Sequence, residues 1–570
     1  MSTARVAEQI VGVGAMPDRH GWIRSDQTVH PGLARFRSTT IGDATLISII
    51  STALTGTTAD QYVGQLVMCV GPYTSPNFGL IRRITDFSPG TDQIFFDALV
   101  ARTQVDDAWE GFDDGSSVFV ESTGGLGATN VRDATRDEAV DFWGPTTGEH
   151  AIVVTSMGQT EPDARPVTAF TSPNLTVAPG FDNIPSVGAL FDVMALPAWS
   201  EPPEFERSWG EVPVEAQRGG VEAFDEEPHL LRIPSWSGKC ALHFKGSGTA
   251  AGNGTQGAYA AESYRMLSAI FDAVRSTGEA VVAGSTTAAV NITDGTLAQF
   301  PVGSPALHAA SGRLAMAIST GAGTGAEDIV NLQPYLDRAP AAAEILYGGV
   351  AWYPKITGHQ AVCFHEWDDA MRWHYYGGVP NVELANWGIG QKPTLRFAYQ
   401  GGPFFGYRKA ITLAPQLSSG VVRDTVRPNG LTHSRIILFS SSANLDLLCV
   451  NLSVNYQFDV QKQVFANLPM GFYAMLVVKV TPTFQVTCKV DRASPNDTMY
   501  EIERMLNEGQ FAILAQGNQM PGHTIGWHAH QTQWTGPKFR ASNGMREIEF
   551  TGKVKRSGVS GLGMCGLIQS

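Results

Sequence analysis

The stretch LCVNLSVNYQFDV, residues 448–460, contains the longest strand pattern in the chain. Apolar and other side chains alternate along it, which is the pattern of a β-strand with one face in a core and the other facing water or a partner. The apolar set is Leu448, Val450, Leu452, Val454, Tyr456, Phe458 and Val460. The other set is Cys449, Asn451, Ser453, Asn455, Gln457 and Asp459, without a positive charge.

Two shorter alternating stretches lie on either side of it, KCALHFKG at 239–246 and FQVTCKVD at 484–491. Each is followed by a segment with apolar residues at helical spacing, AAESYRMLSAIFDAV at 260–274 and SPNDTMYEIERMLNEG at 494–509. Ser494, Pro495 and Gly509 are typical of the start and end of the second helix. We therefore expect a strand followed by one helix in each half.

A Trp-His pair follows each predicted helix, and a strand containing a phenylalanine follows each pair. The same elements in the same order, at nearly the same spacing, predict a tandem duplication. The fold class expected is mainly β, with two duplicated β-sandwich or barrel domains, each with one flanking α-helix, and small N-terminal β-barrel modules. The markers of the duplicated unit are Trp373, His374 and Phe397 in the first copy and Trp527, His528 and Phe550 in the second.

Turn-rich segments divide the rest of the chain. Arg83, Thr85 and Phe87 in one short strand match Arg165, Thr168 and Phe170 in another, so two N-terminal β modules are related or resemble one another by chance. The predicted units are an N-terminal arm at 1–40, module A at 41–125, module B at 126–200, and duplicated domains at 201–402 and 403–570. Residues 198–220, rich in Pro and Glu, are a plausible linker.

Composition excludes several classes of protein. The net charge is −14 and only 16% of residues are charged, which argues against a protein that grips nucleic-acid phosphates. The six cysteines form no CxxC pair, which favours buried, reduced thiols over a disulfide framework or a zinc site. The N-terminus lacks a signal-peptide pattern and no apolar run reaches 18 residues, so we expect synthesis in a cytoplasm and no membrane insertion.

Two clusters could carry chemistry. His528 and His530 would share one face of a strand and could hold a metal together with His523, but no carboxylate or cysteine is close in sequence. Glu366, Asp368 and Asp369 could supply a carboxylate pair for glycoside hydrolysis, although adjacent aspartates more often form a solvated turn. Since the familiar nucleophile and metal motifs are absent from the sequence, we expect no enzymatic activity, no cofactor and no bound metal.

Several of these segments resemble structural proteins of tailed bacteriophages. Residues 42–87, ending in RRITDF, resemble a small β module of such proteins. GQKPTLRFAYQGG at 390–402, NLSVNYQFDV at 451–460 and NGMREIEFTGKV at 543–554 are similar to the strands that open and close tail tube domains of long-tailed, non-contractile phages. The resemblance covers roughly residues 41–90 and 205–555; the chain departs from simple tube proteins in its length and its long N-terminal region.

The resemblance implies a ring. Six tube domains form one ring, so a chain with two copies would close a ring with three chains and pseudo-sixfold symmetry, in which strands of neighbours join into a continuous inner barrel. Stacked rings would let genomic DNA pass without specific binding, and other partners would be the tape measure, terminator and distal tail proteins. The expected location is the virion tail, after assembly in the host cytoplasm. We expect the lumen or a subunit boundary to be lined by Asn451, Ser453, Asn455, Gln457 and Asp459.

The first functional hypothesis is therefore the tail tube subunit. A second is another ring component, such as a terminator, distal tail or baseplate hub protein. A third, from a different class, is a tail-associated carbohydrate-binding protein or hydrolase that uses the region of Glu366, Asp368 and Asp369.

Overall fold

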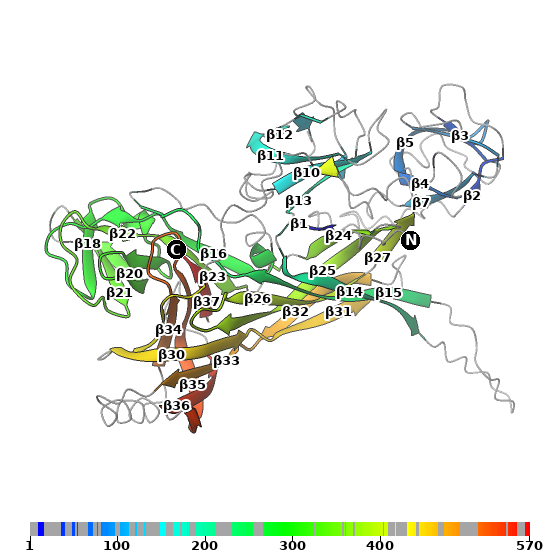
Figure 1. Cartoon of the computed structure of the whole chain (residues 1–570). Coiled ribbons are helices and arrows are strands. Elements are labelled where there is room, and N and C mark those ends of the chain that lie inside the picture. Colours follow the sequence, from blue (N-terminus) through cyan, green and yellow to red (C-terminus); the bar gives the residue numbers. More distant parts are fainter. Residues whose placement is uncertain are drawn as a thin grey trace, which may run out of the picture.

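The computed structural model of the 570-residue chain is built almost entirely of β-strands (Figure 1). Within the segments it describes, no helix has the length and hydropathy of a membrane span. The described residues are 10–15, 36–39, 48–51, 54, 66–71, 77, 81–96, 103–105, 107–112, 120–121, 130–132, 149–155, 163–171, 174–178, 180–181, 190–195, 197, 199–212, 231–252, 254, 266–323, 325, 327–355, 358–359, 361–368, 371–402, 404–408, 416–417, 430–439, 444–464, 472–489, 511–542, 545–555 and 565–570.

The largest sheet contains two rings of antiparallel strands. In the first, which we call the N-terminal barrel, β1 pairs with β24, and the pairing continues through β25, β26, β15 and β14; β13, just before β14 in the chain, pairs with β1 and completes the ring. Its strands are β1 (Ile10–Ala15), β13 (Leu190–Ala195), β14 (Trp199–Val212), β15 (Leu231–His243), β24 (Val362–Asp368), β25 (Met371–Trp387) and β26 (Thr394–Gly401).

The second ring, the C-terminal barrel, closes in the order β29, β30, β33, β36, β35, β34 and back to β29. One further strand lies beside each barrel: β27 pairs with the first half of β25, and β37 pairs with the first half of β35. The strands are β27 (Phe404–Arg408), β29 (Ser434–Phe439), β30 (Asn444–Asn455), β33 (Thr483–Lys489), β34 (Phe511–Gly517), β35 (Ile525–Ser542), β36 (Met545–Val554) and β37 (Cys565–Gln569).

The two barrels are joined edge to edge. Strand β25 of the first pairs with β30 of the second, with Glu383 opposite Asn455 and Leu384 opposite Val454. One hydrophobic core runs through both barrels, from Trp236 to Trp527. This junction therefore makes a single continuous sheet out of the walls of two barrels.

A long hairpin extends from each barrel. The outer parts of β14 and β15 continue past the barrel to Val212 and Leu231. In the second half, β31 (Phe458–Val464) continues the direction of β30 and pairs with β32 (Phe472–Val480). Gln457, between β30 and β31, has a positive φ of 46°, so the chain bends there. The β31–β32 hairpin packs beside β25 of the N-terminal barrel.

A six-stranded sheet is inserted between β16 (Phe271–Ser276) and β23 (Gly349–Pro354), which pair with each other. We call it the inserted sheet; its own core includes Val290, Leu332 and Leu346. Buried Arg313 on this sheet holds Asp446 of the C-terminal barrel through two hydrogen bonds of 2.9 and 2.8 Å. The inserted sheet consists of β17 (Glu279–Ala280), β18 (Ala289–Thr293), β19 (Pro305–His308), β20 (Arg313–Ala322), β21 (Glu327–Gln333) and β22 (Ile345–Tyr347).

The N-terminal strands, blue and cyan in Figure 1, lie between β1 and β13 in the chain. One group forms a separate sheet in the order β2, β7, β4, β5, β6 and β3; the other joins the large sheet. The first group is β2 (Phe36–Arg37), β3 (Ser48–Ile50), β4 (Leu66–Gly71), β5 (Ile81–Ser88), β6 (Gln93–Phe96) and β7 (Ala108–Phe112). The second is β8 (Val120–Glu121), β9 (Asn130–Arg132), β10 (Glu149–Thr155), β11 (Asp163–Thr171) and β12 (Asn174–Val177), with β28 (Gln416–Leu417) parallel to β11.

The mainly β class is confirmed, but the first predicted helix is largely wrong. Among the described residues, α-helical backbone is found at 266–268, and a short 3-10 helix at Leu297–Gln299. Phe271 and Val274, placed on the apolar helix face, lie in β16 instead, because pairing with β23 satisfies their backbone and Phe271 is buried in the core. The second predicted helix, 494–509, lies outside the described residues.

Gly401, at the end of β26, provides a test of core packing. A Cβ atom there would lie 2.0 Å from Cε2 of Trp236, which is buried. We expect Gly401→Ala to lower the free energy of unfolding by about 1–3 kcal/mol, since overpacking displaces a rigid ring. Gly321→Ala on the inserted sheet is the control, because nothing lies within 4 Å of its Cβ position. Equal urea midpoints for the two variants would contradict this view of the core.

Candidate functional site

The polar face of β30 is the starting point for the site. Leu452, Val454 and Tyr456 are fully buried, whereas Asn451 is exposed and Ser453 and Asn455 are half-buried. Gln457 and Asp459 are exposed as well, but they lie beyond the bend, between the strands and on β31. The alternation predicted from the sequence is therefore confirmed over this part of the stretch.

Cys449 departs from the prediction. It was placed on the polar face, yet it is buried in the barrel core, and Val450 is half-buried. The pairing of β30 with β33 shifts between Cys449 and Asn451, which is the mark of a β-bulge. The extra residue at the bulge exchanges the two faces, and a sequence pattern of period two cannot show this.

The polar face continues across the junction into the N-terminal barrel. Asn381 on β25 donates a hydrogen bond from Nδ2 to Oδ1 of Asn455 at 3.2 Å, and its Oδ1 accepts from the backbone N–H of Phe458 at 3.2 Å. In the other direction, Ser453 lies opposite Gln485 on β33, which lies opposite Thr551 on β36. The exposed side chains of the joined wall thus form one polar surface over both barrels, which we call the wall face.

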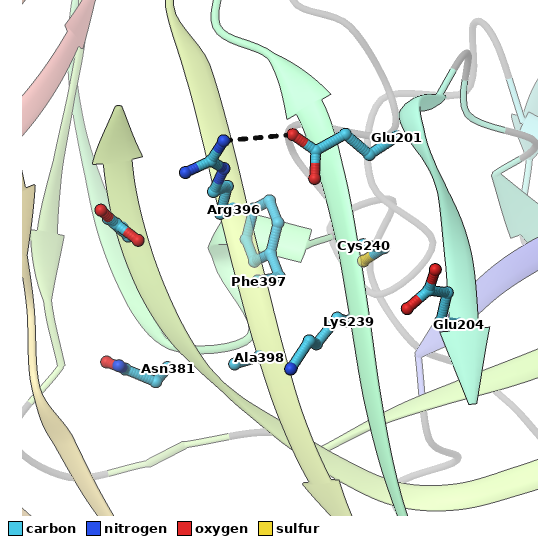
Figure 2. A pocket seen from close by; sticks show the side chains of 9 residues that line it. Glu201, Glu204, Lys239, Cys240, Asn381, Arg396, Phe397 and Ala398 are labelled. Carbon is cyan, nitrogen blue, oxygen red and sulfur yellow. Dashed lines mark hydrogen bonds and ion pairs between the residues drawn. The ribbon is translucent and has the colours of Figure 1, made fainter. Parts of the chain in front are cut away.

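A shallow groove of about 480 Å³ lies in the wall face of the N-terminal barrel. Figure 2 shows Arg396 of β26 and Glu201 of β14 pointing toward one another over it, with a nitrogen–oxygen distance of 3.3 Å. Both side chains are about half exposed, so this ion pair contributes less than about 1 kcal/mol. Its other lining residues are Glu204, Lys239, Cys240, Asn381, Glu383, Phe397 and Ala398.

Charges on the wall face are paired across strands. Glu204 lies opposite Lys239, and Glu383 lies opposite Arg396. In the C-terminal barrel, Lys538 lies opposite Glu549, whose carboxylate also accepts from Arg540 at 2.9 Å. Neighbouring opposite charges cancel each other's field at a distance, so these cations do not form the track that a phosphate backbone binds.

Two strand edges of this wall are open among the described residues. Strand β14 pairs with β15 alone, and residues 533–542 of β35 pair with β36 alone. Exposed Glu201, Glu204 and Glu206 lie on β14, whereas exposed Lys538 and Arg540 lie on β35. Phe539, between these two cations, is 56% exposed. An open edge with a large exposed apolar side chain is a site for pairing with another strand.

The duplication markers fall on corresponding strands. Trp373 and His374 lie in the first half of β25, and Trp527 and His528 lie in the first half of β35. Phe397 and Phe550 are both buried, on β26 and β36, which pair with the second halves of these long strands. Trp527 is fully buried in the core, whereas half-buried Trp373 stacks against the guanidinium of Arg207 at 3.9 Å.

Glu366 is already engaged in interactions within the N-terminal barrel. It is buried, accepts a hydrogen bond from Nη2 of Arg207 at 2.8 Å and is in contact with the hydroxyl of Tyr375. Burial, chiefly, and the Glu366 carboxylate raise the pKa of Tyr375. The side chain of Asp368 and all of Asp369 lie outside the described residues. A carboxylate held by an arginine and a tyrosine stabilises the barrel, and this geometry favours a structural role over the glycosidase hypothesis.

His528 and His530 share one face of β35, with ring centroids 6.1 Å apart. His528 is fully buried, neither ring nitrogen has a hydrogen-bond partner, and burial lowers its pKa to about 3. His523 does not join them: it follows the turn at Met520, before β35 begins. In the described part of the chain, no group of three potential ligand side chains is arranged to hold a metal ion.

Sequence reasoning missed the two open edges. The signals were present as EFER at 204–207 and KFR at 538–540, where apolar and charged residues alternate with opposite sign. Only the pairing of strands far apart in the chain shows that these segments are edges. Searches of protein-family models and of curated protein sequences found no match to this chain, so its function is argued from this geometry.

Proposed function

We propose that this chain is a structural subunit of the tail of a long-tailed bacteriophage, in which three chains close into a pseudo-sixfold ring around a DNA conduit. The tail tube subunit is our first proposal. A terminator, distal tail or baseplate hub protein, each also a ring component, is the second. The protein would act by assembly and not as an enzyme, with the tape measure, terminator and distal tail proteins as further partners in the virion.

Support for a duplication comes from the strand pairings. Strands β29, β30, β33, β34, β35, β36 and β37 occur in the same chain order as β1, β13–β14, β15, β24, β25, β26 and β27. All seven pairings within the first set have a counterpart in the second. The N-terminal strands are inserted after β1, and the inserted sheet lies between β15 and β24. Neither insertion interrupts the pairing of a barrel.

The observation that carries the proposal is the junction of β25 with β30. Cys240 and Val486 lie opposite Phe397 and Phe550, which aligns the two copies residue by residue. By this alignment Glu383 corresponds to Lys538 and Asn455 corresponds to Glu206. The internal pair of Glu383 with Asn455 thus predicts a pair of Lys538 with Glu206 of the next chain.

The same alignment predicts the neighbouring pair. Leu384 and Val454, which lie opposite each other at the internal junction, correspond to Phe539 and Phe205. The pairing would cover the exposed ring of Phe539 and bring a cation of β35 to an anion of β14. We call this contact of β35 with β14 of the next chain the seam. Each chain has both edges, so the contact is head to tail, and repetition about an axis closes a ring.

The wall face suits a conduit for DNA. It joins polar side chains from both barrels, and its cations lie opposite carboxylates. Such a surface repels or ignores a polyanion at short range instead of holding it. Asn451, Ser453 and Asn455 would lie on the lumen side, and Gln457 and Asp459 on the hairpin beside it.

The expected mass tests the proposal directly. Three chains of 61.2 kDa give a particle of about 184 kDa in light scattering, and negative-stain images should show rings with a central hole, stacked for a tube subunit. Single rings that do not stack would favour the terminator, distal tail or hub alternatives. A monomer at every concentration, with isolated compact particles in the images, would refute the ring.

A further inference from the structure

We propose that Cys449 and Cys488 form a site of oxidative modification, a cross-strand disulfide that links β30 to β33 inside the C-terminal barrel. The inference does not depend on the proposed ring, because it concerns one barrel of one chain. It starts from the strand register, in which the two cysteines are directly opposite one another.

The register brings the two sulfur atoms within bonding reach. Directly opposed residues of antiparallel strands have Cα atoms about 4.5–5.5 Å apart, within the range of about 4.4–6.8 Å that a disulfide spans. Both side chains are buried in the same core, at 5% and 1% exposure. The bulge that turns Cys449 inward is what places it on the same side as Cys488.

The other cysteines on described strands have no such partner. Cys240 lies opposite Phe397, and Cys565 lies opposite Ala529. Cys69 lies opposite Trp109, and Cys363 lies opposite Gly14. Cys449 and Cys488 are both free thiols in the structure, so the reduced barrel is complete without the bond.

Burial makes the reaction slow. It raises the pKa of Cys449 to about 12 and that of Cys488 well above its ordinary value, so the thiolate that attacks an oxidant is scarce. Formation therefore requires transient opening of the β30–β33 pair. The thiols should stay reduced in a reducing cytoplasm and become linked slowly once the protein is in an oxidising medium.

The reagent for the test is diamide, a diazene. One thiolate adds to its N=N bond, and the second displaces the nitrogen, so that the S–S bond forms while two electrons and two protons convert the diazene into a hydrazine. After incubation of the full chain near the foot of its thermal transition, we expect the mass to fall by two hydrogen atoms and a peptide pair joined through Cys449 and Cys488 to appear.

Thermal unfolding gives a second readout. The bond closes a loop of about 40 residues, so the midpoint of the barrel should rise by roughly 5 °C and return on addition of dithiothreitol. Cys449→Ala and Cys488→Ala should each abolish the mass loss, whereas Cys240→Ala should retain it. Two independent alanine variants guard against a folding defect in one of them. Persistence of both free thiols in the wild type, or a bond that survives in Cys449→Ala, would overturn the proposal.

Discussion

Glu206→Lys is expected to abolish ring formation while leaving the chain folded. In the proposed seam, Glu206 of β14 lies opposite Lys538 of the neighbouring chain, so the substitution replaces an attraction by a repulsion. A close pair at a strand edge is worth roughly 0.5–1 kcal/mol in either sense, which gives a change of about 1–2 kcal/mol per seam. Three seams close one ring, so the equilibrium constant for the ring falls by about 10²–10⁴ at low salt. Light scattering over a concentration series measures this shift.

The charge swap makes the test specific. Lys538→Glu alone should also prevent assembly, but the double variant Glu206→Lys/Lys538→Glu should restore it, because the pair is again attractive with its signs exchanged. Glu206 is exposed and accepts a weak hydrogen bond from Ser237 at 3.4 Å, so little fold stability depends on it. Asp294→Lys, at an exposed position beyond β18 of the inserted sheet, makes the same change of charge and should leave the rings intact. Failure of the double variant to assemble would locate the contact elsewhere.

The sequence predicted those parts of the fold that depend on local pattern. The alternation from Leu452 to Phe458 identified a strand with a buried and a polar face, because the spacing of side chains along a strand does not depend on its partners. The same holds for Cys240 and Leu242 on β15 and for Val486 on β33, which are buried as their alternation predicts.

Parts of the fold set by long-range contacts could not be predicted in this way. Phe271 and Val274 have helical spacing, yet strand β23, about 80 residues later, recruits them into a sheet. The ion pair of Arg207 with Glu366 joins residues 159 positions apart, and nothing near either residue announces it. Strand β1, within the segment predicted as an arm, pairs with β24 at the other end of the N-terminal barrel.

The two barrels also show why the open edges matter. Within one chain, β25 has a partner on each side of its second half, β26 and β30. Its counterpart β35 has β36 on one side, and the other side is open among the described strands. The internal junction therefore shows what an occupied edge looks like, with Leu384 and Val454 fully buried. Exposure of Phe539 at the corresponding position is the energetic reason to expect a second chain there.

His528 should make the stability of the C-terminal barrel strongly dependent on pH. Burial lowers its pKa from 6.5 to about 3, so between these values the unfolded chain binds a proton that the folded chain excludes. Stability is fully present above pH 6.5 and is lost as the pH falls toward 3, because a folded-state pKa below the unfolded value favours unfolding in acid. Between pH 7.5 and pH 4.5 the expected loss from this one histidine is roughly 2–3 kcal/mol.

His528→Phe isolates this contribution. The ring of Phe439 stacks on His528 at 6.1 Å with an interplanar angle of 14°, so phenylalanine can take the same place without leaving ring nitrogens unpaired. At pH 7.5 the variant should be at least as stable as the wild type, since the buried imidazole makes no hydrogen bond. At pH 4.5 it should be more stable by roughly 2–3 kcal/mol in urea unfolding followed by tryptophan fluorescence. Other titrating groups are common to both proteins and cancel in the difference. Parallel pH profiles for the two proteins would mean that His528 reaches solvent or a partner in solution, and a metal held with His530 would be detected as a wild-type stability that falls on addition of a chelator.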